Sequence, residues 1–416
     1  MASVFLCHSS QDRKFVERLA SDLSANGVDV WFDRWEIKVG DSIVAKISEG
    51  ICSHDYLAII LTPNSVKSKW VQLELNAALM KELDKQQVVV LPILAEACTM
   101  PPLIAEKRYA NFTGEYYSGL IDLLSVLLPD KYDSCLSPSI EIVDAHAHLW
   151  FEHFDSDLDH VISRARVSGV RKIVVSGCSG VLSWAKCIHI AERYEGIYVS
   201  IGLHPSPNRA IEEIDLFEKF ARHPRVVALG DAYLDYRFTF RSHKSQANML
   251  NLHFDTAEGL DLPLVVTVVN AEDNKDAEED FWEILKPRRH KKLKLIFESP
   301  PSIDFANKCR DLGYYIMVEG NFTFSRADSV RSIVKEFPIE RIVLASDCPF
   351  TSPEPVRKLK RNEPYCIRYI LDAMEKVLPY KAQDIARITT CTAKNLFKFD
   401  ECDKRVGSLI HEPFTG

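Results

Sequence analysis

The sequence predicts an α/β protein of two domains, an open parallel sheet covered by helices and then a (β/α)8 barrel. The length of 416 residues exceeds that of one typical domain. Segments of strand-like and helix-like character alternate before residue 129 and again after residue 139, and the segment between them is rich in Pro, Ser and Asp. Such alternation favours parallel strands with helices packed on the sheet.

The first domain is expected to contain strands over residues 4–7, 28–32, 56–61, 88–94 and 108–112. Helices are expected over residues 11–25, 42–52, from Trp70 onward and 114–128. In open parallel sheets, ligands bind beyond the carboxyl ends of the strands. The loops that leave those ends are residues 8–12, 33–41 and 62–70.

Three motifs of this domain resemble those of a bacterial TIR domain, in order and in spacing. They are Val-Phe-Leu-Cys-His-Ser-Ser-Gln-Asp at residues 4–12, the segment of residues 30–42, and Ser-Lys-Trp at residues 68–70 followed by Glu74. The resemblance implies a flavodoxin-like fold, homo-oligomerisation through the loop of residues 34–41, and cleavage of NAD by a helix glutamate. Glu74 occupies the position of that glutamate.

The chemistry of NAD suits a single carboxylate at Glu74. Glu74 lies one helical turn after Trp70, so its carboxylate and the indole share one helix face. Nicotinamide leaves as a neutral base and needs no general acid, unlike the leaving group of an ordinary glycoside. One carboxylate near the ribose can stabilise the positive charge that develops there.

Five residues are predicted to bind NAD around Glu74. An aromatic face favours a cationic ring, and serines at a helix N-terminus favour phosphate. The predicted NAD-binding residues are Ser9, Ser10, Asp33, Trp35 and Trp70. Two alternatives stay open: Asp33 can instead pair with Arg34, and a TIR domain can serve as an adaptor that binds other TIR domains without catalysis. An adaptor has no need of the helix glutamate and its tryptophan, so we expect NAD cleavage.

A change of periodicity over residues 129–139 marks the domain boundary. The predicted division is a TIR domain at 1–131, a linker at 132–139 and a barrel at 140–416. Eight strands are expected over residues 141–145, 171–176, 197–201, 226–229, 264–269, 293–297, 314–318 and 341–345. Eight strand–helix units over this length predict a barrel whose function lies at the carboxyl ends of its strands.

Histidines and carboxylates gather at those strand ends. His146 and His148 form an HxH pair whose side chains point the same way along a strand, which suits joint binding of a divalent metal. This motif and those at residues 202–205, 230–236 and 346–349, with segments 361–364 and 389–397, resemble a TatD-like metal-dependent DNase over the whole barrel.

The barrel departs from the family pattern at three ligand positions. Asp231 stands where the family has a glutamate, Thr267 stands where it has the fifth-strand histidine, and the sixth-strand histidine is missing. The remaining donors are expected to hold one divalent metal (Zn, Mg or Mn). These donors are His146, His148, Asp231 and Asp347. A two-metal mechanism needs a second cation, so we expect the barrel to be a sensor, regulatory or oligomerisation domain.

Composition indicates which partners and which cellular compartment the protein is expected to have. A net charge of −8 and a pI near 5.9 argue against a broad nucleic-acid-binding surface. The eleven cysteines form no CxxC pair, which predicts reduced thiols in a cytoplasmic protein. No segment predicts a membrane span or a leader.

The sequence therefore predicts an NAD⁺ glycohydrolase of prokaryotic antiphage defence, with a nucleic acid or protein trigger at the barrel. The product can be ADP-ribose or its cyclic form. Two alternatives remain: a metal-dependent DNase with a TIR interaction module, and a non-catalytic TIR scaffold.

Overall fold

The computed structural model describes most of both predicted domains. The described residues are 2–32, 54–67, 90–114, 116–128, 140–204, 213–237, 241–271, 275–288, 292–357 and 361–410. They form two compact units, the first built mainly from residues before Ile140 and the second mainly from residues after it. The predicted helix over 42–52, the loop of residues 33–41 and the helix that carries Glu74 lie outside the described residues.

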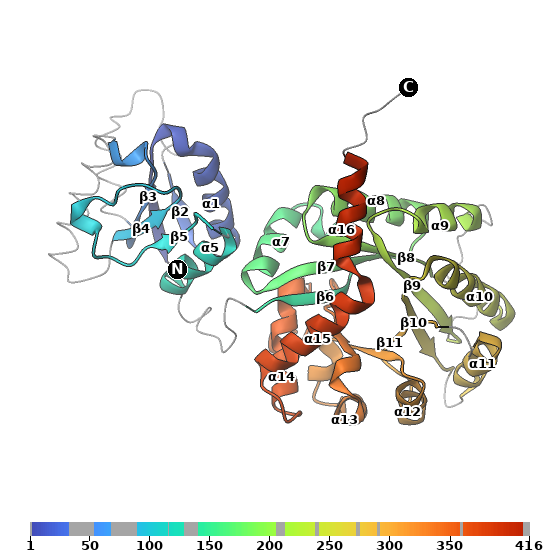
Figure 1. The fold of residues 1–416 in the computed structure, drawn as a ribbon. Helices are drawn as coiled ribbons and strands as arrows, with labels where there is room; N and C mark the ends of the chain where they lie inside the picture. Colours follow the sequence, from blue (N-terminus) through green and yellow to red (C-terminus); the bar gives the residue numbers. More distant parts are fainter. Residues whose placement is uncertain are drawn as a thin grey trace, which may run out of the picture. The chain divides into compact units, whose positions relative to one another are not determined.

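The first unit contains an entirely parallel five-stranded sheet (Figure 1). Its order is β2-β1-β3-β4-β5, and the strands are β1 (Ser3–Cys7), β2 (Asp29–Trp31), β3 (Tyr56–Leu61), β4 (Val90–Leu94) and β5 (Ala110–Asn111). The described α-helices of this unit are α1 (Arg13–Ala25) and α5 (Tyr116–Leu127). This strand order is the flavodoxin-like one, so the predicted fold is confirmed.

Alternation along the strands explains why both faces of this sheet are covered. Val4 and Leu6 of β1 lie in one buried apolar cluster with residues of α1 and α5, whereas Phe5 and Cys7 lie in a second cluster on the other face. Helix α1 is followed by Asn26 and then by Gly27, whose φ of 93° suits glycine, as the sequence predicts.

The second unit contains eight parallel strands in sequential order from β6 to β13. They are β6 (Ile142–Ala147), β7 (Val170–Gly177), β8 (Ile197–Leu203), β9 (Val226–Asp235), β10 (Leu264–Val269), β11 (Leu295–Glu298), β12 (Tyr315–Val318) and β13 (Ile342–Leu344). After residue 140 the described α-helices are α7 (Leu158–Val167), almost all of which groups with the first unit, and then α8 (Val181–Arg193), α9 (Glu213–Ala221), α10 (His243–Leu260), α11 (Asp276–Leu285), α12 (Ile303–Asp311), α13 (Asp328–Glu336), α14 (Ile367–Glu375), α15 (Ala382–Phe397) and α16 (Phe399–Ile410). The arrangement is the predicted (β/α)8 barrel.

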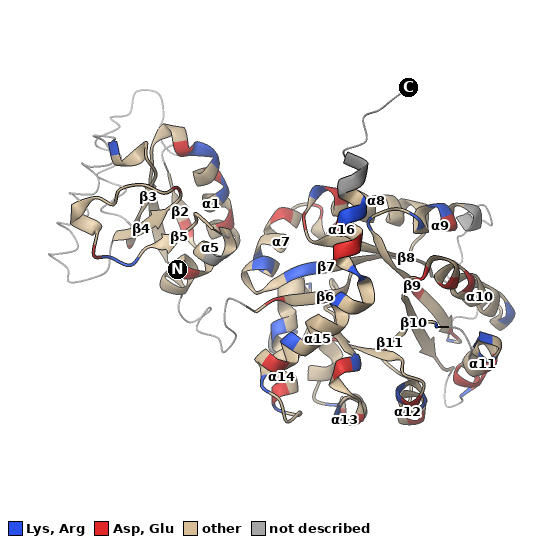
Figure 2. Cartoon of the chain, in the orientation of Figure 1, with Lys and Arg blue, Asp and Glu red and all other residues tan. Residues whose placement is uncertain are grey.

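The first and last strands meet and bring the sheet close to a full barrel. Asp347, just after β13, donates its backbone N–H to the carbonyl of His146 on β6 over 3.0 Å. Apolar side chains fill the interior, and Phe399 at the start of α16 packs on Tyr198 of β8 with ring centroids 4.4 Å apart. Charged residues lie mostly on the helices, while the strands are mainly uncharged (Figure 2).

Four barrel strands, β6 to β9, are longer than predicted. β6 extends to Ala147 rather than residue 145, and β9 extends to Asp235 rather than residue 229. The pairing of β9 with β10 continues to Asp235, opposite Val269, although Gly230 and Asp231 interrupt the apolar run that marked the strand in the sequence. Asp231 is therefore a strand residue and not a loop residue.

Within the described residues, no helix is both long and apolar enough to cross a bilayer. The nine cysteines described there are all free thiols, as their spacing predicts.

Candidate metal centre

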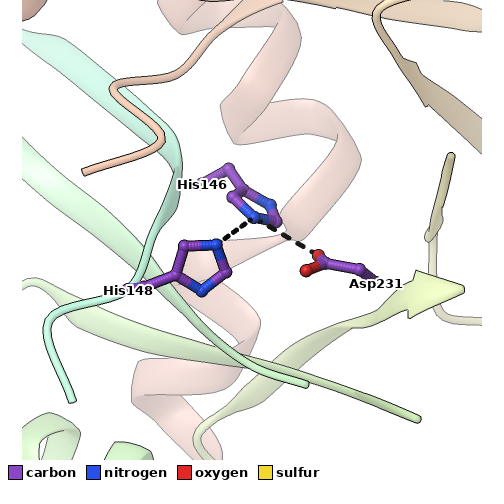
Figure 3. Close-up of side chains that lie close together, drawn as sticks. All are labelled: His146, His148 and Asp231. Carbon is purple, nitrogen blue, oxygen red and sulfur yellow. Dashed lines mark hydrogen bonds and ion pairs between the residues drawn. The ribbon is translucent and has the colours of Figure 1, made fainter. Parts of the chain in front are cut away.

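His146 of β6 and His148 directly after that strand lie together inside the barrel because they are two residues apart at the strand end. Both are buried, and their Nε2 atoms are 3.2 Å apart (Figure 3). The carbonyl of Ser176 lies 3.0 Å from Nδ1 of His148, which directs Nε2 toward His146. The side chains thus present ring nitrogens to one point, as the HxH spacing predicts.

Asp231 enters the same site from β9. Its Oδ1 lies 3.3 Å from Nε2 of His146 (Figure 3) and accepts a 3.0 Å hydrogen bond from the Ser176 hydroxyl. The close approach of β8 to β9 depends on Gly202, where an added Cβ would lie only 2.4 Å from the backbone nitrogen of Asp231. Glycine thus lets the backbone of β9 approach the site.

Asp347 reaches the site from the turn after β13. Its φ of 53° places it in the left-handed region that aspartate tolerates better than most residues. Oδ1 of Asp347 lies 3.5 Å from Nε2 of His148, and the hydroxyl of Thr351 donates to Oδ2. The structure therefore brings together all four residues that the sequence analysis assigned to the metal.

Asp144 supports the site without pointing into it. Its carboxylate accepts hydrogen bonds from the backbone N–H of Ser346 (2.9 Å), the hydroxyl of Ser346 (2.6 Å) and the backbone N–H of His146 (3.3 Å). Burial is the main cause that raises the pKa of Asp144 to about 7, against the lowering effect of these hydrogen bonds. Asp144 thus joins β6 to the turn that carries Asp347.

Opposite charges change the pKa values of the ligand residues. Burial lowers the pKa of His148, but the hydrogen bond to Asp347 and the charges of Asp231 and Asp347 outweigh it and raise that pKa to about 9. Burial raises the pKa of Asp231, yet the nearby His146 and His148 bring it below its usual value. Asp231 is therefore ionised at neutral pH.

The structure adds two acids that the sequence analysis missed, the half-buried Glu298 and the buried Glu319. Glu298 is the last residue of β11, the sixth barrel strand, and one of its carboxylate oxygens lies within 4.8 Å of ligand atoms of His146 and Asp347. Glu319 follows β12. The sequence does mark Glu298, because it directly follows the apolar run Leu-Ile-Phe at the strand end where the family has its sixth-strand histidine.

Thr267 and Glu298 occupy adjacent strands and contact each other. The hydroxyl of Thr267 on β10 donates to Oε2 of Glu298 over 2.5 Å. Burial raises the pKa of Glu298, and the charges of Asp231 and Asp347 raise it further, while His146 lowers it. Burial and the neighbouring Glu298 hold the pKa of Glu319 well above its usual range.

These residues fit a divalent cation. Two histidine nitrogens and several carboxylate oxygens are donors that divalent metals accept. In the described part of the chain, Nδ1 of His146 and Oε1 of Glu319 are buried and have no hydrogen-bond partner. Buried polar atoms without partners are rare in folded proteins and indicate a ligand, water or ion.

Comparison with known proteins assigns both domains. The family model described as TatD related DNase matches residues 143–398, which is more than half of the chain. The chain belongs to the TatD-related DNase family. The model described as TIR domain matches residues 4–124, so the protein joins a TIR domain to a TatD domain, as predicted.

Relatives of the TatD domain occur in bacteria and in animals. The uncharacterized metal-dependent hydrolase YabD of Bacillus subtilis is 32% identical over 262 residues, which cover 62% of this chain and all of YabD. The 3'-5' ssDNA/RNA exonuclease TatD of Klebsiella pneumoniae is 26% identical over 62% of this chain and 98% of that protein. The crystal structure of the TatD homologue YJJV of Escherichia coli K12 has the same fold, with a TM-score of 0.56 at 23% identity over 62% of this chain and 98% of its own.

The TIR domain shows only part of its predicted NAD site. Ser9 caps the first helical turn, where its hydroxyl accepts a 3.4 Å hydrogen bond from the backbone N–H of Gln11, and Ser10 is exposed. The other predicted residues of this site lie outside the described residues. These are Asp33, Trp35, Trp70 and Glu74.

Proposed function

We propose that the TatD domain is a metal-dependent phosphodiesterase that acts on the end of a nucleic-acid strand. The observation that carries this proposal is the convergence of His146, His148, Asp231 and Asp347 on one buried point at the carboxyl end of the barrel strands. When bound there, a divalent cation supplies Lewis acidity to a phosphoryl oxygen and makes water a better nucleophile. The exonuclease activity named for the relative from Klebsiella pneumoniae supports a strand end as the substrate.

Aromatic rings beside the donors support a nucleic-acid substrate. Phe151 and Phe350 lie 5.7 and 5.8 Å from the ring of His148 by centroid, and 5.4 Å from each other. Trp150 packs on Phe151 at 4.2 Å, and Phe350 is 47% exposed. An exposed aromatic ring next to a phosphate-cleaving centre provides a surface on which a base can stack, which is worth about 1–3 kcal/mol per base.

The test is hydrolysis of labelled single-stranded DNA and RNA by the full-length protein with Mg²⁺, Mn²⁺ or Zn²⁺. The wild type shortens the strand, and His146→Ala or Asp347→Ala loses roughly 100-fold or more. Phe350→Ala weakens binding of the strand by about 5- to 150-fold. Binding without hydrolysis under every cation would contradict the proposal and favour the sensor role expected from the sequence.

We also propose that the TIR domain cleaves the bond between nicotinamide and ribose in NAD. The match of residues 4–124 to the TIR family supports this second activity, as does the one-turn spacing of Trp70 and Glu74. Glu74 is the proposed catalytic carboxylate. Ser9 supports phosphate binding, because it caps a helical turn whose backbone N–H groups attract anions.

The NAD activity is tested by nicotinamide release from the full-length protein at high concentration. Glu74→Gln lowers release by roughly 100-fold or more, since one preorganised electrostatic group contributes that much. Glu17→Gln changes a partly exposed carboxylate of α1 that pairs with Arg13 in the same domain, and it serves as the matched control. Release that survives Glu74→Gln refutes the role of Glu74, and mass spectrometry of the product separates ADP-ribose from its cyclic form.

We place this activity in the cytoplasm of a prokaryotic cell, where oligomers formed through the TIR domain deplete NAD during phage infection. Cells that produce the wild-type protein should lose NAD and restrict phage, and cells that produce Glu74→Gln should do neither. Phage restriction by Glu74→Gln equal to the wild type would exclude NAD depletion as the cause.

A further inference from the structure

The barrel holds two overlapping groups of metal donors that differ in chemistry. One group is His146, His148 and Asp231, with two nitrogen donors and one carboxylate. The other is His146, Glu298 and Asp347, with one nitrogen donor and two carboxylates, and its ligand atoms lie within 4.8 Å of one another. Glu298 therefore adds a carboxylate to the side of the site that faces Asp347.

Neighbouring strands fix Glu298 in this place. Thr267 of β10 donates to its Oε2 over 2.5 Å, so one carboxylate oxygen has a protein partner and the orientation of the group is set. Partners that hold a ligating carboxylate in position are a usual feature of protein metal sites. Thr267 thus holds the carboxylate of Glu298 in position from the adjacent strand.

Glu319 makes this side of the site still richer in oxygen. Its side chain is buried, it lies close enough to Glu298, Asp347 and Asp231 to interact with their charges, and its Oε1 has no hydrogen-bond partner in the described part of the chain. Burial of an acid beside three other acids costs free energy unless a cation offsets the charge. A cation between these carboxylates provides that compensation.

We propose that Glu298 is a ligand of the barrel's divalent cation and shifts the preference of the site toward oxygen-preferring cations such as Mn²⁺. The reason is donor chemistry: carboxylate oxygens suit Mg²⁺ and Mn²⁺, while imidazole nitrogens suit Zn²⁺. The inference rests on the proposed binding of a cation by the TatD domain, but not on hydrolysis.

The test measures cation binding by the full-length protein after removal of metal with a chelator. Binding of Mn²⁺ is followed by electron paramagnetic resonance of the free ion, and binding of Zn²⁺ by competition with a chromogenic chelator. We expect Glu298→Gln to weaken Mn²⁺ binding by about tenfold or more, within the range seen when partners of a metal site are removed. The same variant should change Zn²⁺ binding by much less.

Two further variants make the result specific. Glu278→Gln changes a buried barrel glutamate, whose carboxylate is occupied by hydrogen bonds from Asn270 (2.8 Å) and Ser302 (2.9 Å), and should bind Mn²⁺ like the wild type. Glu298→His replaces the oxygen donor by a nitrogen donor and should shift the preference toward Zn²⁺. Thermal unfolding of each variant checks that it is folded.

The outcomes separate this inference from the proposed function. Mn²⁺ binding by Glu298→Gln that equals the wild type, with Glu298→His also unchanged, overturns the role of Glu298 and leaves the phosphodiesterase proposal standing. A wild-type protein that binds neither cation overturns both.

Discussion

Asp144 shows how one buried carboxylate can organise a metal centre that it does not enter. It accepts hydrogen bonds from both the backbone and the hydroxyl of Ser346 and thereby fixes the turn before Asp347. Asp144→Ala leaves these buried donors without an acceptor, so we expect it to lower the free energy of unfolding by about 2–4 kcal/mol and to weaken cation binding. Urea denaturation and Mn²⁺ titration measure the two effects.

Asp144→Asn is the milder variant, because the amide keeps the shape and one acceptor oxygen. It should lose less stability than Asp144→Ala. If both variants unfold like the wild type, the hydrogen bonds to Ser346 do not hold the turn, and this account of Asp144 is wrong.

The raised pKa of His148 predicts how cation binding depends on pH. Its pKa is raised to about 9 in the cation-free protein, above the ordinary value of 6.5, so it carries a proton at pH 7.5. A ligating imidazole must be neutral, so binding at this pH releases a proton and the cation affinity increases as the pH rises toward 9. The charge interaction of His148 with Asp231 and Asp347 stabilises the folded protein when no cation is bound. This stabilisation is fully present below pH 6.5 and is lost as the pH rises through 9.

Calorimetry detects this proton directly. At pH 7.5, the measured enthalpy of cation binding should differ between buffers of different ionisation enthalpy. Asp231 contributes no proton, because its pKa is lowered and the carboxylate is already ionised. Equal enthalpies in both buffers would mean that His148 is neutral before the cation binds.

At the scale of the elements, the approach of β8 to β9 sets the position of Asp231. A Cβ on Gly202 would lie 2.4 Å from atoms of Gly230 and Asp231, closer than packed atoms can approach. Gly202→Ala should therefore force the strands apart, lower the free energy of unfolding by about 1–3 kcal/mol and weaken cation binding. Thermal unfolding and Mn²⁺ titration check both effects.

Gly259→Ala is the matched control for this substitution. Gly259 lies in α10, and nothing lies within 4 Å of a Cβ added there. Alanine at an open helical position should stabilise the protein by about 0.5–1 kcal/mol. If Gly202→Ala is as well tolerated as Gly259→Ala, the close approach of the strands does not position Asp231.

The same elements show what the sequence could reveal of the site. Period-two alternation placed the side chains of His146 and His148 on the same side at the end of β6, and strand-end position identified Asp347. Glu298 escaped prediction because its role depends on contact with Thr267 and Asp347, which lie 31 and 49 positions away in the sequence. A strand-end glutamate is usually a solvated residue, and only the barrel geometry shows that this one lies half-buried among metal donors.

The extent of β9 was missed for a related reason. Gly230 and Asp231 end the apolar run, so alternation stops there in the sequence. The ladder to β10 nevertheless continues through Tyr233 opposite Thr267. Inside a closed barrel, a polar side chain can face the functional end of the interior, and the periodicity of a single strand does not contain that information.

At the scale of the whole molecule, the joining of two domains predicts that their activities are coupled. If nucleic acid bound at the TatD domain controls the TIR domain, a single-stranded oligonucleotide with Mn²⁺ should raise nicotinamide release by about fivefold or more, since coupling energies between sites are typically 1–3 kcal/mol. His148→Ala should abolish this increase but keep the basal release, because it changes only the cation site. Coupling of binding is reciprocal, so a non-hydrolysable NAD analogue should strengthen oligonucleotide binding by the same factor. If the oligonucleotide does not change nicotinamide release and the NAD analogue does not change the affinity for the oligonucleotide, the chain carries two independent enzymes rather than a sensor and its effector.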